Sequence, residues 1–103
     1  MPRTYGEKFL RGLSEADPSS AGVKLGRLCV DANLPAAYVS RALEVSRMTV
    51  YSWFRGRGVN EKNLKTISAF TGLVEQDMAS GVLPAKNLKD AKKYLEDLAG
   101  VKL

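Results

Sequence analysis

The fold is decided by the stretch VSRALEVSRMTVYSWFRG, residues 39–56. Its first half places Val39, Ala42 and Leu43 three and four residues apart, which gives a short helix one apolar face. Ser46 then offers a hydroxyl oxygen to the unpaired amides at the start of a new helix. The stretch therefore predicts two short helices joined by a tight turn.

The second of these helices, expected over Ser46 to Arg55, has two different faces. At about 100° per residue, the apolar Val50, Trp53 and Phe54 lie on one side. The opposite side carries Met48, Tyr51, Ser52 and Arg55. Arg47 lies in the first turn, at the border between the faces. A helix with such an outer face is suited to enter the major groove of DNA and touch base edges.

The pattern around the turn resembles that of the Cro/CI-type helix-turn-helix repressors. The matching positions are Leu43, Val45, Ser46, Arg47, Thr49, Val50, Trp53 and Gly56. The resemblance covers about residues 24–84 and departs from the family pattern at three positions. Pro35 replaces a capping Ser or Thr, Ala36 replaces a phosphate-contacting Gln, and Glu44 replaces Gly. A left-handed Glu44 would cost on the order of 1 kcal/mol.

The resemblance implies an all-α fold, with a five-helix, lambda-repressor-like DNA-binding domain at residues 20–84. Within it, Asn33 is a candidate for a left-handed helix end. Asn60 is expected to cap a helix that ends at Gly72, and residues 73–80 are expected to form one more short helix. An N-terminal segment, 1–19, and a C-terminal amphipathic helix, 85–103, flank this domain.

Each flanking segment allows two interpretations. Residues 1–19 form either a short helix that packs on the domain, which their aromatic and leucine side chains favour, or a basic arm led by Arg3 that follows DNA. In residues 85–103, Asn87 caps a helix whose apolar stripe consists of Leu88, Ala91, Leu95 and Leu98. This stripe packs either on its own domain or on a second copy of the chain. We favour self-association, because two-fold dimers give this family affinity and specificity for palindromic sites.

Basic charge is concentrated around the helix pair. From Ser40 to Lys65 there are six basic and two acidic residues, so +4 of the chain's net charge of +5 lies there. The predicted base contacts are Arg47, Met48, Tyr51 and Ser52, with Arg47 suited to guanine and Met48 to a thymine methyl group. The predicted contacts to the DNA backbone are Ser46, Arg55, Arg57, Lys62 and Arg41. The flexible loop around Arg57 also suits a phosphate.

Composition narrows the remaining function classes. The chain has no histidine, and it lacks a Gly-rich phosphate loop and a distinctive carboxylate pair, so we expect neither an enzyme nor a bound metal or cofactor. The single cysteine, Cys29, is expected to be buried filler. No apolar run is long enough for a membrane span, and the N-terminus lacks a signal-peptide pattern, which favours a cytoplasmic protein.

The leading hypothesis is a sequence-specific regulator of double-stranded DNA, most simply a homodimeric repressor of the compact kind found in phages and mobile elements. The alternative is a helix-turn-helix scaffold that binds a partner protein, as an interaction module or an antitoxin. An exposed Phe54, the N-terminal helix or the C-terminal stripe would then form the surface. A plain helical hairpin without DNA binding and an RNA-binding protein are the weaker alternatives.

Overall fold

The computed structural model describes residues 5–100 and 102, and within this part of the chain every regular element is a helix. The helices are α1 (Glu7–Glu15), α2 (Ala21–Asp31), α3 (Ala36–Ala42), α4 (Arg47–Phe54), α5 (Glu61–Ala79) and α6 (Leu88–Ala99). The prediction of an all-α fold is confirmed. None of the described helices is both long and apolar enough to cross a membrane.

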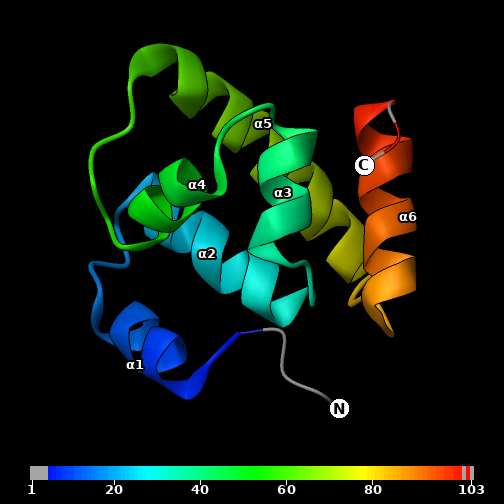
Figure 1. The fold of residues 1–103 in the computed structure, drawn as a ribbon, viewed down its shortest axis with the longest axis horizontal. Helices are drawn as coiled ribbons and strands as arrows, with labels where there is room; N and C mark the ends of the chain where they lie inside the picture. The colour runs from blue at the N-terminus through cyan, green and yellow to red at the C-terminus, as the bar shows by residue number, and fades with distance from the viewer. Residues whose placement is uncertain (1–4, 101, 103) are drawn as a thin grey trace.

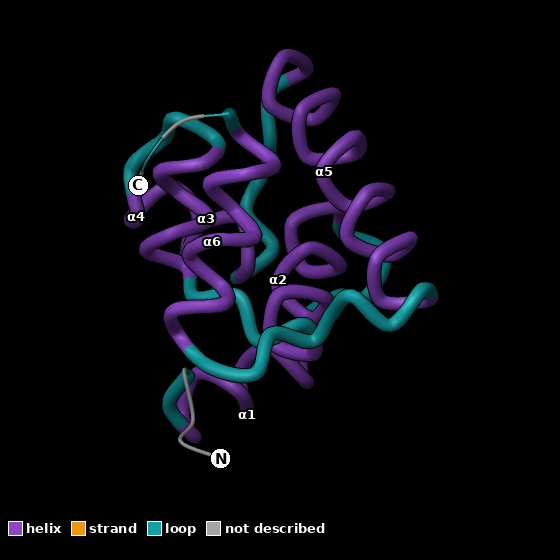
Figure 2. The backbone as a smooth tube through the Cα atoms, turned by 90° about the vertical axis from the view of Figure 1, so that its right-hand side faces the viewer, coloured by secondary structure: helices purple, strands orange, loops and turns teal. Residues whose placement is uncertain are grey.

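Helix α2 lies at the centre of the molecule and packs against α1, α4 and α5. Helix α3 packs against α4 on one side and α6 on the other (Figure 1). In Figure 2, which is viewed from the side that carries α6, this helix lies in front of α3. Helices α1 and α6 therefore cover different sides of the helix-turn-helix pair α3–α4.

A single buried core joins the helices, and it includes residues from both ends of the described chain. Tyr5 and Leu95 belong to the same cluster as Trp53, Phe54 and Cys29. Trp53 is 4% exposed and Phe54 is completely buried, which confirms the predicted inner face of α4. Cys29 is also fully buried, as expected for a residue that fills the core.

Two non-glycine residues, Asn33 and Glu44, adopt the left-handed conformation, each with φ of 58°. Both follow directly after a helix end. At the α3–α4 turn, the Val45 amide donates to the Ser40 carbonyl over 2.9 Å, and the Glu44 amide donates to the Arg41 carbonyl over 3.2 Å. These paired bonds satisfy the last carbonyls of α3 and fix the direction in which α4 begins.

Helix α5 differs from its prediction, because it continues for 19 residues through Gly72. Residues 73–80 are therefore not a separate helix, and residues 20–84 contain four helices instead of the expected five. Glycine in a helix interior costs about 1 kcal/mol relative to alanine. Burial of Phe70, Thr71 and Val74 on both sides of Gly72 outweighs that cost.

The N-terminal segment contains a helix that is held at both ends. The Tyr5 hydroxyl donates to the Leu34 carbonyl over 2.6 Å. At the other end of α1, the Arg27 guanidinium donates to the carbonyls of Leu13, Ser14 and Ala16 over 3.3, 3.1 and 3.4 Å. The prediction of a packed helix is confirmed for the described residues. Arg3, the proposed leader of a DNA-binding arm, lies outside them.

Helix α6 packs on its own chain. Ala91 and Leu95 are fully buried, and α6 contacts α3. The expectation that these two residues form a surface for self-association is therefore wrong, because both are buried within their own chain, where α6 packs against α3. Leu88 is 56% exposed and Leu98 is partly buried. The predicted cap is confirmed, since the Asn87 side chain accepts from the Asp90 amide over 2.9 Å.

The segment between α5 and α6 is tied to the α2–α3 junction. The Asn33 side-chain amide donates to the Ala85 carbonyl over 2.8 Å, and the Ala85 amide donates to the Ala32 carbonyl over 2.9 Å. Tyr5 reaches the same junction through Leu34. Three parts of the chain that are distant in sequence thus meet at one turn.

Candidate nucleic-acid interface

The first turn of α4 is organised by its cap. The Ser46 side-chain oxygen accepts from the Thr49 amide over 3.0 Å, and the Ser46 and Thr49 hydroxyls share a hydrogen bond of 2.8 Å. The capping role predicted for Ser46 is confirmed. The exposed side chains Arg47 and Met48 follow directly after this cap. The start of α4 is thus rigid in its backbone and open to solvent in its side chains.

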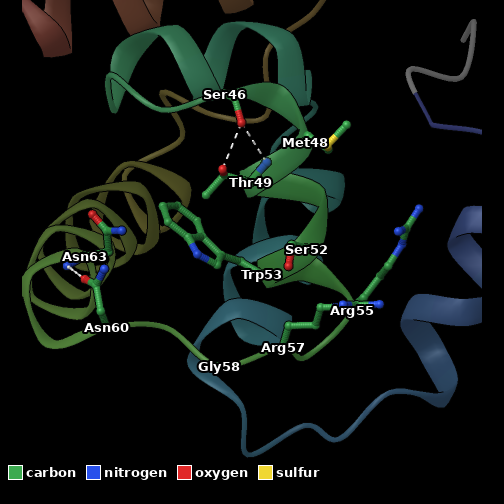
Figure 3. A pocket seen from close by; sticks show the side chains of 10 residues that line it. All are labelled: Ser46, Met48, Thr49, Ser52, Trp53, Arg55, Arg57, Gly58, Asn60 and Asn63. Atoms are coloured by element: carbon green, nitrogen blue, oxygen red, sulfur yellow. Dashed lines mark hydrogen bonds between the residues drawn. The ribbon is translucent and has the colours of Figure 1, made fainter.

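A groove of about 550 Å³ runs between α4 and the N-terminal end of α5 (Figure 3). Its walls are formed by Ser46, Met48, Thr49, Ser52, Trp53, Arg55, Arg57, Gly58, Asn60 and Asn63. Five of the residues predicted to contact DNA therefore share one surface: Ser46, Met48, Ser52, Arg55 and Arg57.

Sequence reasoning missed the contribution of α5 to this groove. Asn60 was recognised only as a helix cap, and its side-chain oxygen does accept from the Asn63 amide over 2.9 Å. That bond leaves the amide nitrogen of Asn60 to donate elsewhere. Asn63, one turn further along α5, brings a second side-chain amide. The presence of Asn at both positions is the only local signal in the sequence.

Four of the predicted DNA contacts lie outside the groove lining: Arg41, Arg47, Tyr51 and Lys62. Arg41, Arg47 and Lys62 are exposed, but none of them is among the residues that line the groove. Arg41 is on α3, Arg47 begins α4, and Lys62 is in the first turn of α5. These three side chains are therefore exposed to solvent, but they do not line the groove.

Tyr51 requires a correction to the predicted outer face of α4. Its ring lies edge-on to Phe9 of α1, with ring centroids 5.4 Å apart, and edge-on to Phe54, with centroids 6.1 Å apart. Tyr51 is partly buried against the core as a result. The reason is that α1 covers this side of α4. The open face of α4 is accordingly the narrower line of Met48, Ser52 and Arg55.

The groove has a basic and hydrogen-bonding character. None of the described residues that line it is acidic, and it carries two guanidinium groups, two hydroxyl-bearing Ser residues, one Thr and two side-chain amides. Met48 is 82% exposed, so its flexible thioether is available to an apolar contact. Two other hollows differ from this groove because acidic residues line them. One includes Asp31, and another includes Asp90 and Asp97.

These groups match what a DNA surface offers. Guanidinium groups bind phosphates and guanine edges, amides and hydroxyls bond to bases or the backbone, and an apolar side chain can contact the methyl group of thymine. The combination also stands on an exposed helix, the element whose width fits the major groove. The geometry is thus suited to binding a polyanion along one face of α4.

Comparison of the chain with family models, with curated proteins and with solved structures found no match. The resemblance to the Cro/CI-type repressors stays a prediction, and it depends on the residues from Leu43 to Gly56.

Proposed function

We propose that the chain is a sequence-specific binder of double-stranded DNA that regulates transcription by inserting α4 into the major groove. The observation that carries this proposal is the groove beside α4, where five expected contact residues meet and no described lining residue is acidic. A repressor of the compact type found in phages and mobile elements, with a lambda-repressor-like arrangement, is the form of this function that the residue pattern favours.

In this function, some side chains contact base edges and others contact the phosphate backbone. Met48 and Ser52 face outward along α4 and read base edges, together with Arg47 at its start. Arg57 and Asn60 hold the phosphate backbone on the side of the groove next to α5, and Arg55, at the edge of the groove, is a further cation for the backbone. Ser46 orients the helix and is available to a phosphate through its hydroxyl. Lys62 and Arg41 add charge at the margins. No catalytic step and no cofactor enter this function.

The alternative function is capture of a partner protein, and two of the surfaces expected for it are buried. Phe54 is completely buried, and Ala91 and Leu95 are covered by α3. An exposed apolar patch is what such a function needs. A homodimer remains part of the proposed DNA-binding mode, but its contact surface must lie elsewhere than the buried part of α6.

The test begins with selection of duplexes from a random DNA pool by the purified chain. We expect an enriched sequence, and an inverted repeat with half-sites about one helical turn apart if the chain binds as a dimer. The binding of that sequence is then measured by fluorescence anisotropy at several salt concentrations. A DNA contact must weaken steeply as salt rises, whereas an apolar protein interface is little affected.

Matched variants separate the roles. Arg47→Ala should cost about 1–3 kcal/mol and relax selection at one base position, whereas Arg57→Ala should weaken binding to all duplexes alike. Lys89→Gln removes the same charge from α6, on the other side of α3 (Figure 1), and should leave binding unchanged. Failure to enrich any duplex would overturn the proposed function. Equal, sequence-independent losses in the Arg47 and Arg57 variants would overturn the division of roles.

A further inference from the structure

A second hollow of about 560 Å³ lies on the opposite side of α4, between this helix and α1. It is lined by Lys8, Phe9, Gly12, Leu13, Phe54 and Arg55. Arg55 lines this hollow and the groove beside α5, so the two depressions meet at its side chain. Figure 3 shows the arrangement: α5 lies on one side of α4, and the Arg55 side chain extends toward α1 on the other side.

We propose that this hollow is a second site for the DNA backbone, which binds phosphates of the strand on the α1 side of the major groove. The inference depends on the proposed function and extends it. A helix in the major groove lies between two backbone strands. The groove with Arg57 and Asn60 faces one strand, and Lys8 with Arg55 faces the other.

The chemistry of the hollow fits a sugar–phosphate strand. Lys8 and Arg55 supply two cations, and Phe9 and Leu13 supply an apolar floor. A DNA strand alternates anionic phosphates with largely apolar sugars, so both kinds of surface find a counterpart. None of the described lining residues is acidic, which distinguishes this hollow from its neighbour between α1 and α2, where Asp31 is present.

Helix α1 is held firmly in the position that such a contact requires. The ring of Phe9 lies 5.4 Å from that of Tyr51 and 6.0 Å from that of Phe54, measured between centroids. Together with the hydrogen bonds of Tyr5 and Arg27 described above, these contacts fix both ends of α1. A cation on a fixed helix loses less conformational entropy on binding than one on a flexible arm.

Gly12 lies beside the hollow at an open position of α1. It lies one turn after Lys8 in the interior of α1, where glycine lowers helix stability by about 1 kcal/mol relative to alanine. No packing contact requires a glycine, because a Cβ built at this position meets no atom within 4 Å. The missing side chain therefore leaves the surface of the hollow open.

The same open space makes Gly12 a suitable position for a test. Gly12→Glu and Gly12→Gln introduce side chains of nearly equal size, and neither meets a steric conflict. Only the first adds a negative charge. Both variants should melt at or above the temperature of the parent chain, since each replaces a glycine in a helix. We expect Gly12→Glu to bind the selected duplex about fivefold or more weakly than Gly12→Gln, roughly the effect of one unfavourable charge contact.

The second pair of variants is Lys8→Gln and its charge-matched control Lys89→Gln. Loss of one phosphate contact lowers the slope of log affinity against log salt by about 0.9. When salt is raised from 50 to 200 mM, both chains lose affinity, and the loss for Lys8→Gln should be about 3.5-fold smaller than the loss for the parent chain. Phosphate ethylation interference should show in addition that, within each half-site, Lys8→Gln loses its sensitivity to ethylation on one strand only.

The outcomes separate this inference from the proposed function. If Arg57→Ala weakens binding while Lys8→Gln and Gly12→Glu bind like their controls, the second backbone site is refuted and the function stands. If ethylation interference changes equally on both strands of a single half-site in Lys8→Gln, the assignment of the hollow to one strand is refuted. If the parent chain binds no duplex at all, the proposed function and this inference both fail.

Discussion

Helices α2 and α4 pack closely at Gly22, and substitution of this residue by alanine is a direct test of how α4 is positioned. A Cβ added there would overlap the Trp53 carbonyl oxygen and lie 2.7 Å from the Trp53 carbonyl carbon. Ordinary contact begins at 3.4 Å, so the two helices must separate by at least 0.7 Å. The obstacle is backbone, which cannot rotate away as a flexible side chain can.

Forced overpacking of this kind costs about 1–3 kcal/mol, and the rigid obstacle places Gly22→Ala in the upper part of that range. In a domain of this size, 1 kcal/mol shifts the melting temperature by about 4–8 °C. We therefore expect Gly22→Ala to lower the melting temperature by about 10–20 °C. Urea unfolding followed by circular dichroism would measure the free energy, and Trp53 fluorescence would report on the contact itself.

The control is Gly72→Ala, a glycine in the interior of α5 whose added Cβ meets nothing within 4 Å. This variant should be more stable than the parent by about 0.5–1 kcal/mol, because alanine is the better helix former. The same chemical change should therefore lower the free energy of unfolding at Gly22 and raise it at Gly72. If Gly22→Ala is as stable as the parent chain, or more stable, the close approach of α2 and α4 is refuted.

Three further predictions concern the cap of α4, the packing of α6 and alkaline pH. Ser46→Ala should lower the free energy of unfolding by about 1 kcal/mol through loss of the cap, whereas the exposed Ser14→Ala should change it by less than about 0.5 kcal/mol in the same urea titration. Leu95→Ala should cost about 2–5 kcal/mol with a melting temperature independent of protein concentration, and a concentration-dependent melting temperature would contradict packing within one chain. Burial raises the pKa of the Cys29 thiol and of the Tyr5 hydroxyl above their ordinary values of 9.0 and 10.0. Both groups then stay neutral in the folded chain while the unfolded chain ionises, so stability should be constant below about pH 9 and fall above it, by up to about 1.4 kcal/mol per pH unit for each group. A melting temperature that rises between pH 9 and pH 11 would refute this sign.

Helix starts were predictable because a cap is a local interaction. Ser46, Asn60 and Asn87 each bond to the amide three residues further on, and no distant part of the chain is needed to form that bond. The left-handed helix end at Asn33 is local in the same way. For this reason the sequence alone located the α3–α4 pair and five of the residues that line the groove beside α4.

Errors arose where a distant segment decides the outcome. Tyr51 looks outward on a helical wheel, but Phe9, 42 residues earlier, packs against its ring. The apolar periodicity of α6 predicts a buried stripe without indicating what buries it, and the answer is α3 of the same chain. At Gly72 the local preference for ending a helix is weaker than the burial of its neighbours. In each case the missing information is tertiary contact.

The hydrogen bonds that join Ala85 to Ala32 and Asn33 affect how the chain behaves while it is being made. Ala85 leaves the ribosome 52 residues after Asn33, which at 5–20 residues per second corresponds to roughly 3–10 s. During that interval α2, α3 and α4 have been synthesised, but the face of α3 that Ala91 and Leu95 later cover is open. A nascent chain at this stage should therefore expose an apolar helix face, the kind of surface that makes folding intermediates prone to aggregation.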